Sequence, residues 1–457
     1  MIGRSKESFD FRLLIILPLL IIVVVVAFLL NNKIGYAPVV SDELDIDNSD
    51  QKIEWNKYAT YNIELEETLN ITRPGTYTLS GVLTTGGINI DVTIGHVKLV
   101  LDNVSIKNPD GPAIYCSSAD ALVIESKGKN YLEDGVKYAE YYDLDVTGAI
   151  YTKSDLVLTG EGQLKVVSNY QDGIISKDDL TIRSGKYNVI SKDDGIRGKD
   201  SIHIVNGEIV IDSKADGLKS TNETDHGKGF IYIENGDILI SSGDDGMHAA
   251  KELIINDGVI DITKSYEGLE APKITISQGE IKIKSTDDGI NAGAGTSTSN
   301  TPRPGGISDA DKNCIIAING GNIYINATGD GVDSNGYVYM NDGRLIVDGP
   351  TNDKNGALDA GIGLVINGGE VIAVGSSGMA EGFSKESKQL STKIIMNEFY
   401  KPGSKITLKD KDGETIMEHE PAKRFSSIVL SSPNFELGEE YILYIDGKEF
   451  RKIEIKN

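Results

Sequence analysis

The stretch from Asp194 to Ile211 reads DGIRGKDSIHIVNGEIVI and contains the pattern that decides the fold. It runs Asp-Gly-apolar, then a turn, a short strand with alternating apolar residues, Asn-Gly, and a second alternating strand. Alternation with a period of two buries one face of a strand and exposes the other. Glycine at a corner permits the positive φ that a tight bend requires. The stretch therefore predicts two short strands joined by sharp turns.

The same pattern recurs through the middle of the chain with a period of about 22 residues, a length typical of solenoid repeats. A glycine marks one corner of each repeat, and most neighbouring glycines of this series lie one period apart. The series comprises Gly173, Gly195, Gly217, Gly246, Gly268, Gly289, Gly331 and Gly378. The longer gap before Gly246 fits one period plus an insertion, Thr221 to Gly227. The gap before Gly331 fits two periods that include a Gly-, Ser-, Thr- and Pro-rich loop, Ala292 to Gly306.

A unit of about 22 residues is too short for a propeller blade, and the regular Leu and Asn positions of a leucine-rich repeat are missing. No coil of this length buries its apolar face alone, so stacking of coils must build the core. The sequence predicts an all-β fold, a right-handed parallel β-helix (a solenoid) over residues 61–390. We expect one inward apolar ladder: Ile174, Ile196, Leu218, Met247, Leu269, Ile290 and Val332.

The repeat stops after Leu390, and residues 391–457 contain turn signals and a strand, Glu440 to Ile445. An uncapped solenoid would expose an unpaired strand edge, which proteins generally cover. This region is therefore predicted to be a small C-terminal β cap.

The N-terminal region contains an unbroken apolar run, Leu13 to Leu30, near the lower length limit for a transmembrane helix. Basic residues precede it and acidic residues follow it, which places the N-terminus in the cytoplasm. We predict a cytoplasmic tail (1–12), a single transmembrane anchor in the cell membrane (13–30), an acidic linker (31–60) and an extracellular remainder. A cleaved signal peptide is the alternative, but no small-x-small site directly follows the run.

The formal net charge is −24, which argues against nucleic acid as a partner unless metal ions intervene. For the same reason the membrane is expected to be contacted only through the N-terminal helix. Cys116 and Cys314 would lie many coils apart, farther than the roughly 7 Å that a disulfide spans between Cα atoms. Both cysteines are interpreted as small buried residues.

An acidic residue directly precedes nearly every glycine of the series: Asp172, Asp194, Asp216, Asp245, Glu267, Asp288 and Asp330. Stacking places equivalent residues about 4.8 Å apart. Two unit charges at that distance repel by roughly 0.9 kcal/mol in bulk water, and by more where water is thin. The repulsion has two candidate solutions. Either the side chains accept backbone N–H groups at the turns, or Ca²⁺ binds between coils.

Calcium is the cofactor that we predict, because it takes six to eight oxygen ligands and neither Cys nor His clusters here in a way that favours zinc or copper. Glu267 should stack over Asp288, and Glu270 over Asn291, to form one oxygen-rich pocket. A second pocket is expected around Asp330. The predicted ligands are Asp245, Glu267, Glu270, Asp287, Asp288, Asn291, Asp330 and Asp333.

The residue two positions after each glycine should face outward, because it alternates with the inward ladder. These residues are Ile175, Arg197, Lys219, His248, Glu270, Asn291 and Asp333. A mixed polar column beside a row of metal sites suits a ligand surface, but it is equally compatible with ordinary solvated surface.

Five segments carry a family resemblance when they are taken in order along the chain. They are RPGTYTLSG (73–81), TIRSG (181–185), YEGLEA (266–271), DDGINA (287–292) and GDGVDSNG (329–336). With them the chain resembles a family of clostridial and other bacterial extracellular β-helical carbohydrate-binding proteins, described as cellulose- and acid-sugar-binding. The resemblance implies a calcium-containing parallel β-helix, similar in shape to pectate lyases, that binds pectin-like polyuronates. The apolar run near the N-terminus departs from an evidently secreted form.

Three functions are compatible with this pattern. The first is calcium-dependent, non-catalytic binding of an acidic or other cell-wall polysaccharide at the cell surface, with no enzymatic activity. The second is a polyuronate lyase, which would need a base close to the metal row. The only cations near that row are Lys219, Lys273 and Arg197, and no pattern distinguishes any of them as a base. The third is a structural surface spacer or adhesin.

Overall fold

A computed structural model describes residues 44–293 and 310–456. Within these ranges the chain is all-β, with two short 3-10 turns, η1 (Ser49–Lys52) and η2 (Trp55–Lys57), and no α-helix. The anchor predicted over 13–30 lies outside the described residues. Among the described residues, no helix is sufficiently long and apolar to span a bilayer.

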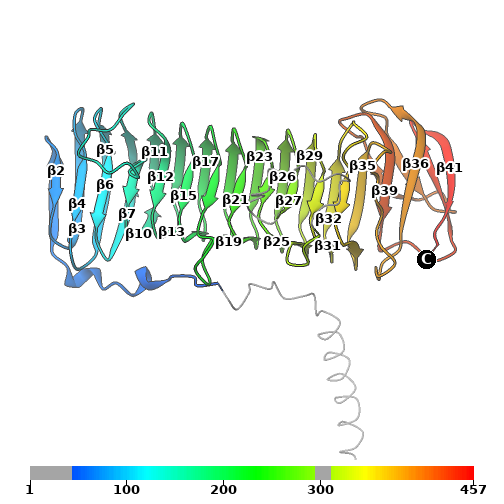
Figure 1. Cartoon of the computed structure of the whole chain (residues 1–457), viewed down its shortest axis with the longest axis horizontal. Coiled ribbons are helices and arrows are strands. Elements are labelled where there is room, and N and C mark those ends of the chain that lie inside the picture. Colours follow the sequence, from blue (N-terminus) through cyan, green and yellow to red (C-terminus); the bar gives the residue numbers. More distant parts are fainter. Residues whose placement is uncertain (1–43, 294–309, 457) are drawn as a thin grey trace, which may run out of the picture. The chain divides into compact units, whose positions relative to one another are not determined.

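Twelve short parallel strands stack along one axis to form a sheet that we call sheet B (Figure 1). Most of these strands are very short, because each contributes one side of a coil. They are β2 (Leu69–Ile71), β4 (Ile88–Asp91), β6 (Ile114–Ser118), β9 (Gly148–Thr152), β12 (Asp172–Ser176), β15 (Ile196–Gly198), β18 (Leu218–Ser220), β21 (Met247–Ala249), β24 (Leu269–Glu270), β27 (Ile290–Ala292), β30 (Val332–Ser334) and β33 (Leu358–Ala360).

The remaining solenoid strands belong to a 25-stranded sheet, sheet A, which contains two parallel series. The long strand β5 (Val97–Lys107) pairs with a strand of each series and thereby joins them, and it also pairs with the long strand β3 (Gly75–Leu83). The first series continues with β1 (Thr60–Leu65), β7 (Ala121–Lys127), β10 (Asp155–Gly160), β13 (Asp179–Ile182), β16 (Ser201–Ile204), β19 (Phe230–Ile233), β22 (Glu252–Ile255), β25 (Lys273–Ile276), β28 (Ile315–Ile318), β31 (Tyr337–Met340) and β34 (Gly363–Ile366). The second comprises β8 (Lys129–Glu133), β11 (Gln163–Val167), β14 (Lys186–Ile190), β17 (Glu208–Asp212), β20 (Asp237–Ser241), β23 (Val259–Ser265), β26 (Glu280–Ser285), β29 (Asn322–Ala327), β32 (Arg344–Asp348) and β35 (Glu370–Gly375).

One coil thus runs from a sheet B strand through one strand of each series, as β15, β16 and β17 do. The predicted parallel β-solenoid is confirmed by this arrangement. The right-handed sense of the coils stays a prediction, based on the strong preference of parallel crossovers for that hand.

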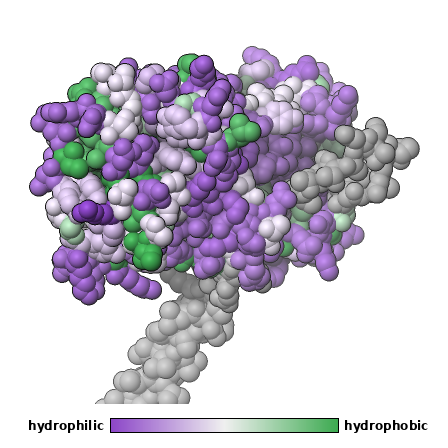
Figure 2. Space-filling view, turned by 60° about the vertical axis from the view of Figure 1, so that its left-hand side comes forward, coloured by the Kyte–Doolittle hydropathy of each residue, from purple (hydrophilic) through white to green (hydrophobic). Residues whose placement is uncertain are grey.

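The predicted inward ladder is confirmed, because all seven of its residues are fully buried. They belong to one continuous apolar core that extends from Leu65 to Val429. Cys116 and Cys314 are both free and buried, as predicted. The visible outer face is largely hydrophilic (Figure 2), in keeping with the acidic composition.

The gap between Gly289 and Gly331 was predicted as two coils, and this prediction is wrong. Ile290 pairs directly with Val332, and β25 pairs directly with β28, so the gap is one coil with a long insertion. The inserted stretch lacks the alternating apolar residues that a second coil would need to fill its share of the core. The last coil also departs from the glycine series, because Leu358 lies opposite Val332 and the corner residue is Ala357 instead of Gly378.

The C-terminal region closes the solenoid by changing to antiparallel pairing. Strand β35 pairs with β39 (Phe425–Ser431), which pairs in turn with β36 (Ser391–Tyr400). A four-stranded antiparallel sheet follows, formed by β37 (Ile406–Lys409), β38 (Thr415–His419), β40 (Glu440–Ile445) and β41 (Lys448–Glu454). The buried carboxylate of Asp348 joins the parts, because it accepts hydrogen bonds from His419 Nε2 and Tyr324 Oη, both at 2.7 Å.

Part of the segment that the sequence assigns to a linker lies against the solenoid. We call residues 44–59 the N-terminal strap. Asp45 donates its N–H to the carbonyl of Gly227 at 3.1 Å, and Asp50 forms an ion pair with Arg183. At its other end Trp55 lies under the ammonium of Lys98, 4.8 Å from the ring centroid. The strap therefore runs along the outer side of several consecutive coils (Figure 1).

Replacing Gly195 by Ala is expected to destabilise the solenoid by about 1–3 kcal/mol, because the site has no room for a methyl group. A Cβ there would lie 2.4 Å from Ile211 Cγ2 and 2.6 Å from the Gly217 carbonyl oxygen. Gly363→Ala is the matched control, since its Cβ would meet nothing closer than 3.7 Å. Urea unfolding of both variants tests the expectation, and equal midpoints would contradict it.

Candidate functional site

From β6 to β33 the outward residues of sheet B form one column along the solenoid, which we call the sheet B column. In-register pairing stacks each member on the next, as with Arg197 on Lys219 and Glu270 on Asn291. The chemistry changes from aromatic and apolar, through cationic, to acidic and polar. The members are Tyr115, Tyr151, Ile175, Arg197, Lys219, His248, Glu270, Asn291, Asp333 and Asp359.

Beside this column, the acidic residues that precede the corner positions form a hydrogen-bonded series that we call the acid ladder. In five of the six steps a carboxylate Oδ1 accepts the backbone N–H of the acidic residue one coil further on. The bonds run from Asp194 N to Asp172 (3.2 Å), Asp216 N to Asp194 (3.1 Å), Asp245 N to Asp216 (2.9 Å), Glu267 N to Asp245 (3.2 Å) and Asp330 N to Asp288 (2.6 Å). Carboxylates thus accept backbone N–H groups as the turn-chemistry explanation requires, but between coils instead of within one turn.

Three cations of the sheet B column compensate the first half of the ladder. Arg197 lies 3.8 Å from Asp172 and 3.9 Å from Asp194. Lys219 lies 2.5 Å from Asp216 and 3.7 Å from Asp194. These carboxylates are at most 3% exposed, and a buried carboxylate requires a partner charge or hydrogen bonds. The protein's own side chains therefore offset part of the charge here, although burial still raises the pKa of Asp194 to about 7 and that of Asp172 above its ordinary value.

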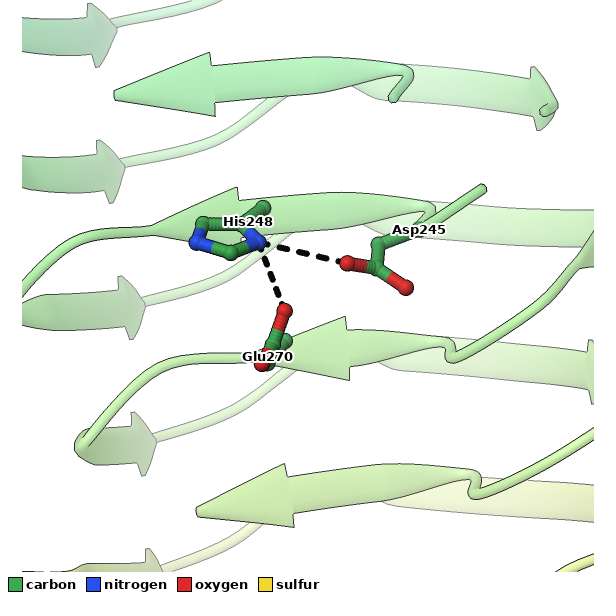
Figure 3. Close-up of side chains that lie close together, drawn as sticks. All are labelled: Asp245, His248 and Glu270. Carbon is green, nitrogen blue, oxygen red and sulfur yellow. Dashed lines mark hydrogen bonds and ion pairs between the residues drawn. The ribbon is translucent and has the colours of Figure 1, made fainter. Parts of the chain in front are cut away.

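His248 is the third cation and lies between two carboxylates (Figure 3). Its Nδ1 is 3.2 Å from Asp245 Oδ2 and 2.6 Å from Glu270 Oε2, on the neighbouring coil. Burial disfavours the charge, but the two carboxylates outweigh burial and raise the pKa of His248 to about 10. A pocket of about 160 Å³ adjoins this group and is lined also by Glu223 and Pro272.

In the second half of the ladder, no cationic side chain among the described residues pairs with the carboxylates described next. Asp288, Asp330 and Asp333 have carboxylate oxygens within 4.8 Å of one another, and we call them the acid cluster. In the described part of the chain none of them forms an ion pair with Lys, Arg or His. Burial first, and then repulsion from neighbouring carboxylates, raises the pKa of Asp288 to about 6, that of Asp333 to about 7 and that of Asp330 to about 8.

The eight predicted calcium ligands do not meet at one point. Asp245 and Glu270 hold His248, while Asp288, Asp330 and Asp333 form the acid cluster. Glu267 accepts the amide of Asn291 at 2.9 Å, and burial raises its pKa to about 8. Asp287 lies next to Asp288 in the chain but outside the groups of potential metal ligands found among the described residues.

Sequence reasoning missed two features of this surface. His248 had been placed in the outward column, but its position between two carboxylates depends on Glu270 of the next coil. Asp359 was missed because its coil has Ala357 at the corner, although Leu358-Asp359 repeats the Val332-Asp333 pattern. Burial also raises the pKa of Asp359.

The cations considered as lyase bases are not well placed for that role. Burial opposes the charge of Lys219, but Asp216 and Asp194 prevail and raise its pKa, which weakens it as a base. Arg197 is engaged with two ladder carboxylates. Lys273 lies on sheet A, where it lines a separate pocket of about 250 Å³ with Lys228 and Lys251.

One further lysine has a lowered pKa, in contrast to Lys219. Burial lowers the pKa of Lys423 to about 8. This residue belongs to the C-terminal region, two positions before β39, and its ammonium donates to the carbonyl of Ala327 at the end of β29. No pattern in the sequence singled it out, because its burial depends on how the C-terminal region packs against the solenoid.

Fold and surface together define a parallel β-solenoid that presents a long, charged column on one sheet. Residues 65–301 match the family described as "Carbohydrate-binding domain-containing protein". The match covers more than half of the chain, and the protein therefore belongs to this family.

A curated relative, a carbohydrate-binding domain-containing protein of Acetivibrio thermocellus, is 36% identical over 133 residues, which are 27% of this chain and 45% of the relative. The chain thus spans a little under half the length of that relative. A solved structure, of a polysaccharide lyase-like protein from C. thermocellum in a gadolinium derivative, is 29% identical with a TM-score of 0.42. The similarity covers 48% of this chain and 92% of that one.

In metal-free protein, Asp330→Asn is expected to raise the melting temperature by several degrees at pH 8 and to change it little at pH 4. The amide keeps an oxygen for the Gly356 N–H but removes a buried charge. A carboxyl whose pKa is raised on folding stabilises the fold fully only below its unfolded pKa. That stabilisation is lost as the pH rises towards about 8.

Differential scanning calorimetry in a chelator, at a series of pH values, measures this effect. Asp342→Asn is the control, because Asp342 also accepts a glycine N–H, that of Gly343, but at an exposed turn. A gain for Asp330→Asn that is as large at pH 4 as at pH 8 would refute the electrostatic explanation.

Proposed function

We propose that this protein binds acidic polysaccharide along the sheet B column in a calcium-dependent manner and does not cleave it. The observation that carries the proposal is the acid cluster, an uncompensated group of carboxylates at one end of an elongated polar column. Membership of a carbohydrate-binding family supports the kind of ligand. An anionic protein can hold an anionic glycan when a divalent cation lies between the two sets of carboxylates.

The residues of the acid cluster fit calcium. All three side chains offer carboxylate oxygen, the ligand type that Ca²⁺ prefers. In Asp288 and Asp330 one oxygen accepts a backbone N–H, which fixes the carboxylate and leaves its second oxygen for a cation. Bound Ca²⁺ would supply the positive charge that Arg197, Lys219 and His248 supply elsewhere, and it would coordinate a uronate carboxylate from the ligand.

The cationic residues of the column would bind the glycan by hydrogen bonds instead of through a metal ion. Arg197 and Lys219 keep about 30% of their side chains exposed while they pair with the ladder. Their outer N–H groups can donate to hydroxyl or carboxylate oxygens of a glycan that lies along the column. We also propose that the chain is held at the outer surface of the cell membrane by residues 13–30.

A lyase is the alternative function, because the similar solved structure is described as polysaccharide lyase-like. Elimination would require a neutral base close to the metal-bound sugar. Lys219 is unsuited by its raised pKa. Lys423 has a suitable pKa of about 8, but its ammonium is directed at the Ala327 carbonyl.

Calcium is expected to raise the melting temperature of the soluble ectodomain, because it binds only the native acid cluster. At a calcium concentration of 100 times the dissociation constant, the stabilisation is about 2.7 kcal/mol. Calorimetry with EDTA and then with excess calcium tests this for the wild type and for Asp288→Asn/Asp333→Asn. A calcium response of equal size in the double variant would exclude the acid cluster as the site.

Polygalacturonate is expected to pull down the ectodomain in calcium, and EDTA is expected to abolish this binding. The ultraviolet absorbance of the unsaturated sugar that a lyase would release should not increase during the same incubation. Sustained product formation that is lost in Lys219→Ala, Lys273→Ala or Lys423→Ala would establish the lyase instead. Asp342→Asn again serves as the control for binding.

A further inference from the structure

An insertion between β8 and β9, residues 134–147, gathers tyrosines at one end of the sheet B column. Tyr142 packs edge-on against Tyr115 of β6, with ring centroids 5.2 Å apart, and lies 4.6 Å from Tyr141. Tyr138 lies 5.8 Å from Tyr142 and 4.5 Å from Tyr170. The five rings form one contiguous group, which we call the tyrosine patch.

The insertion is held in place by buried polar contacts. Asp134, at its start, is 3% exposed and accepts hydrogen bonds from Tyr138 Oη and Ser168 Oγ, both at 2.7 Å. The N–H of Ala139 donates to the carbonyl of Asp110 at 2.8 Å. The rings are therefore arranged before any ligand binds, which lowers the entropic cost of binding.

The same insertion closes the column at this end. Tyr151 and Ile175, two column members, are at most 1% exposed because the insertion covers them, with Val146 and Tyr142 packed against them. On the outer side Tyr141 remains 76% exposed. Beyond the two covered members, the next accessible member of the column is Arg197, whose neighbour in register is Ile175. An exposed aromatic surface thus directly adjoins the cationic part of the column.

A pyranose ring matches this surface chemically. One face of such a ring carries C–H groups that pack on an aromatic face, while tyrosine hydroxyls can bond to the sugar hydroxyls. The interaction needs neither a carboxylate on the sugar nor a metal ion. The match to a carbohydrate-binding family, together with the accessible N–H groups of Arg197 and Lys219 in the adjoining column, favours a glycan over a protein partner.

We propose that the tyrosine patch is a second glycan subsite, which stacks the face of a neutral pyranose ring without calcium. The ligand is again a polysaccharide, so the inference rests on the proposed function in this one respect. A single glycan chain could then contact the patch and continue past Arg197 towards the acid cluster. Sugar units without a carboxylate would be held at one end of the column and uronates at the other.

The test measures binding of soluble hydroxyethyl cellulose, an uncharged β-glucan, by affinity electrophoresis in EDTA. Tyr141→Ala and Tyr142→Ala are each expected to weaken binding about tenfold, since a stacked ring contributes on the order of 1 kcal/mol or more. Tyr141→Phe should retain most of the binding because it keeps the ring. Tyr339→Ala is the control, since Tyr339 stacks on Tyr337 in sheet A, away from the patch.

The outcomes separate the two proposals. Loss of glucan binding in EDTA, with calcium-dependent polygalacturonate binding retained by the Tyr141→Ala variant, supports the subsite. Wild-type protein that does not bind the glucan in EDTA overturns the subsite and leaves the calcium-dependent function standing. Sedimentation that shows a wild-type dimer and a Tyr141→Ala monomer, with glucan binding unchanged, would identify the patch as an interface between copies and overturn the subsite.

Discussion

In-register stacking imposes one electrostatic constraint on this molecule, because a carboxylate of each coil lies directly against that of the next. The acid ladder meets part of the constraint by directing each Oδ1 at a backbone N–H of the following coil. Burial still makes the remaining charge unfavourable. Burial raises carboxyl pKa values in both halves of the column. Arg197, Lys219 and His248 form ion pairs with the carboxylates of one half, whereas the acid cluster in the other half has no such pair among the described residues. The two halves of the surface therefore differ in electrostatic character as well as in composition.

Much of the fold followed from the sequence, because the period fixes which residues stack. Ile196 over Leu218 could be predicted from spacing alone, and the structure has this pair in register. The long gap between Gly289 and Gly331 could not be resolved in the same way. Its length equals two periods, and only the direct pairing of Ile290 with Val332 shows that one coil is present.

The candidate site was predictable where it depends on position within a coil and not where it depends on contacts between coils. The acidic column was evident from its place before each glycine, but burial, which spacing does not reveal, is the main cause of the raised carboxyl pKa values. The partners of His248 depend on side-chain direction across two strands. Asp359 was missed because the corner residue of its coil is Ala357 instead of glycine, although the strand still pairs in register.

A stack of coils normally holds together through nearest neighbours alone, so that its ends can fray while the middle stays folded. The N-terminal strap changes this, because one short segment contacts residues as far apart as Lys98 and Gly227. Opening any coil beneath the strap would disturb contacts made by several others. The strap therefore couples distant coils and should make the first half of the solenoid unfold as a single cooperative unit, while the coils beyond Gly227 rely on their immediate neighbours and on the C-terminal cap.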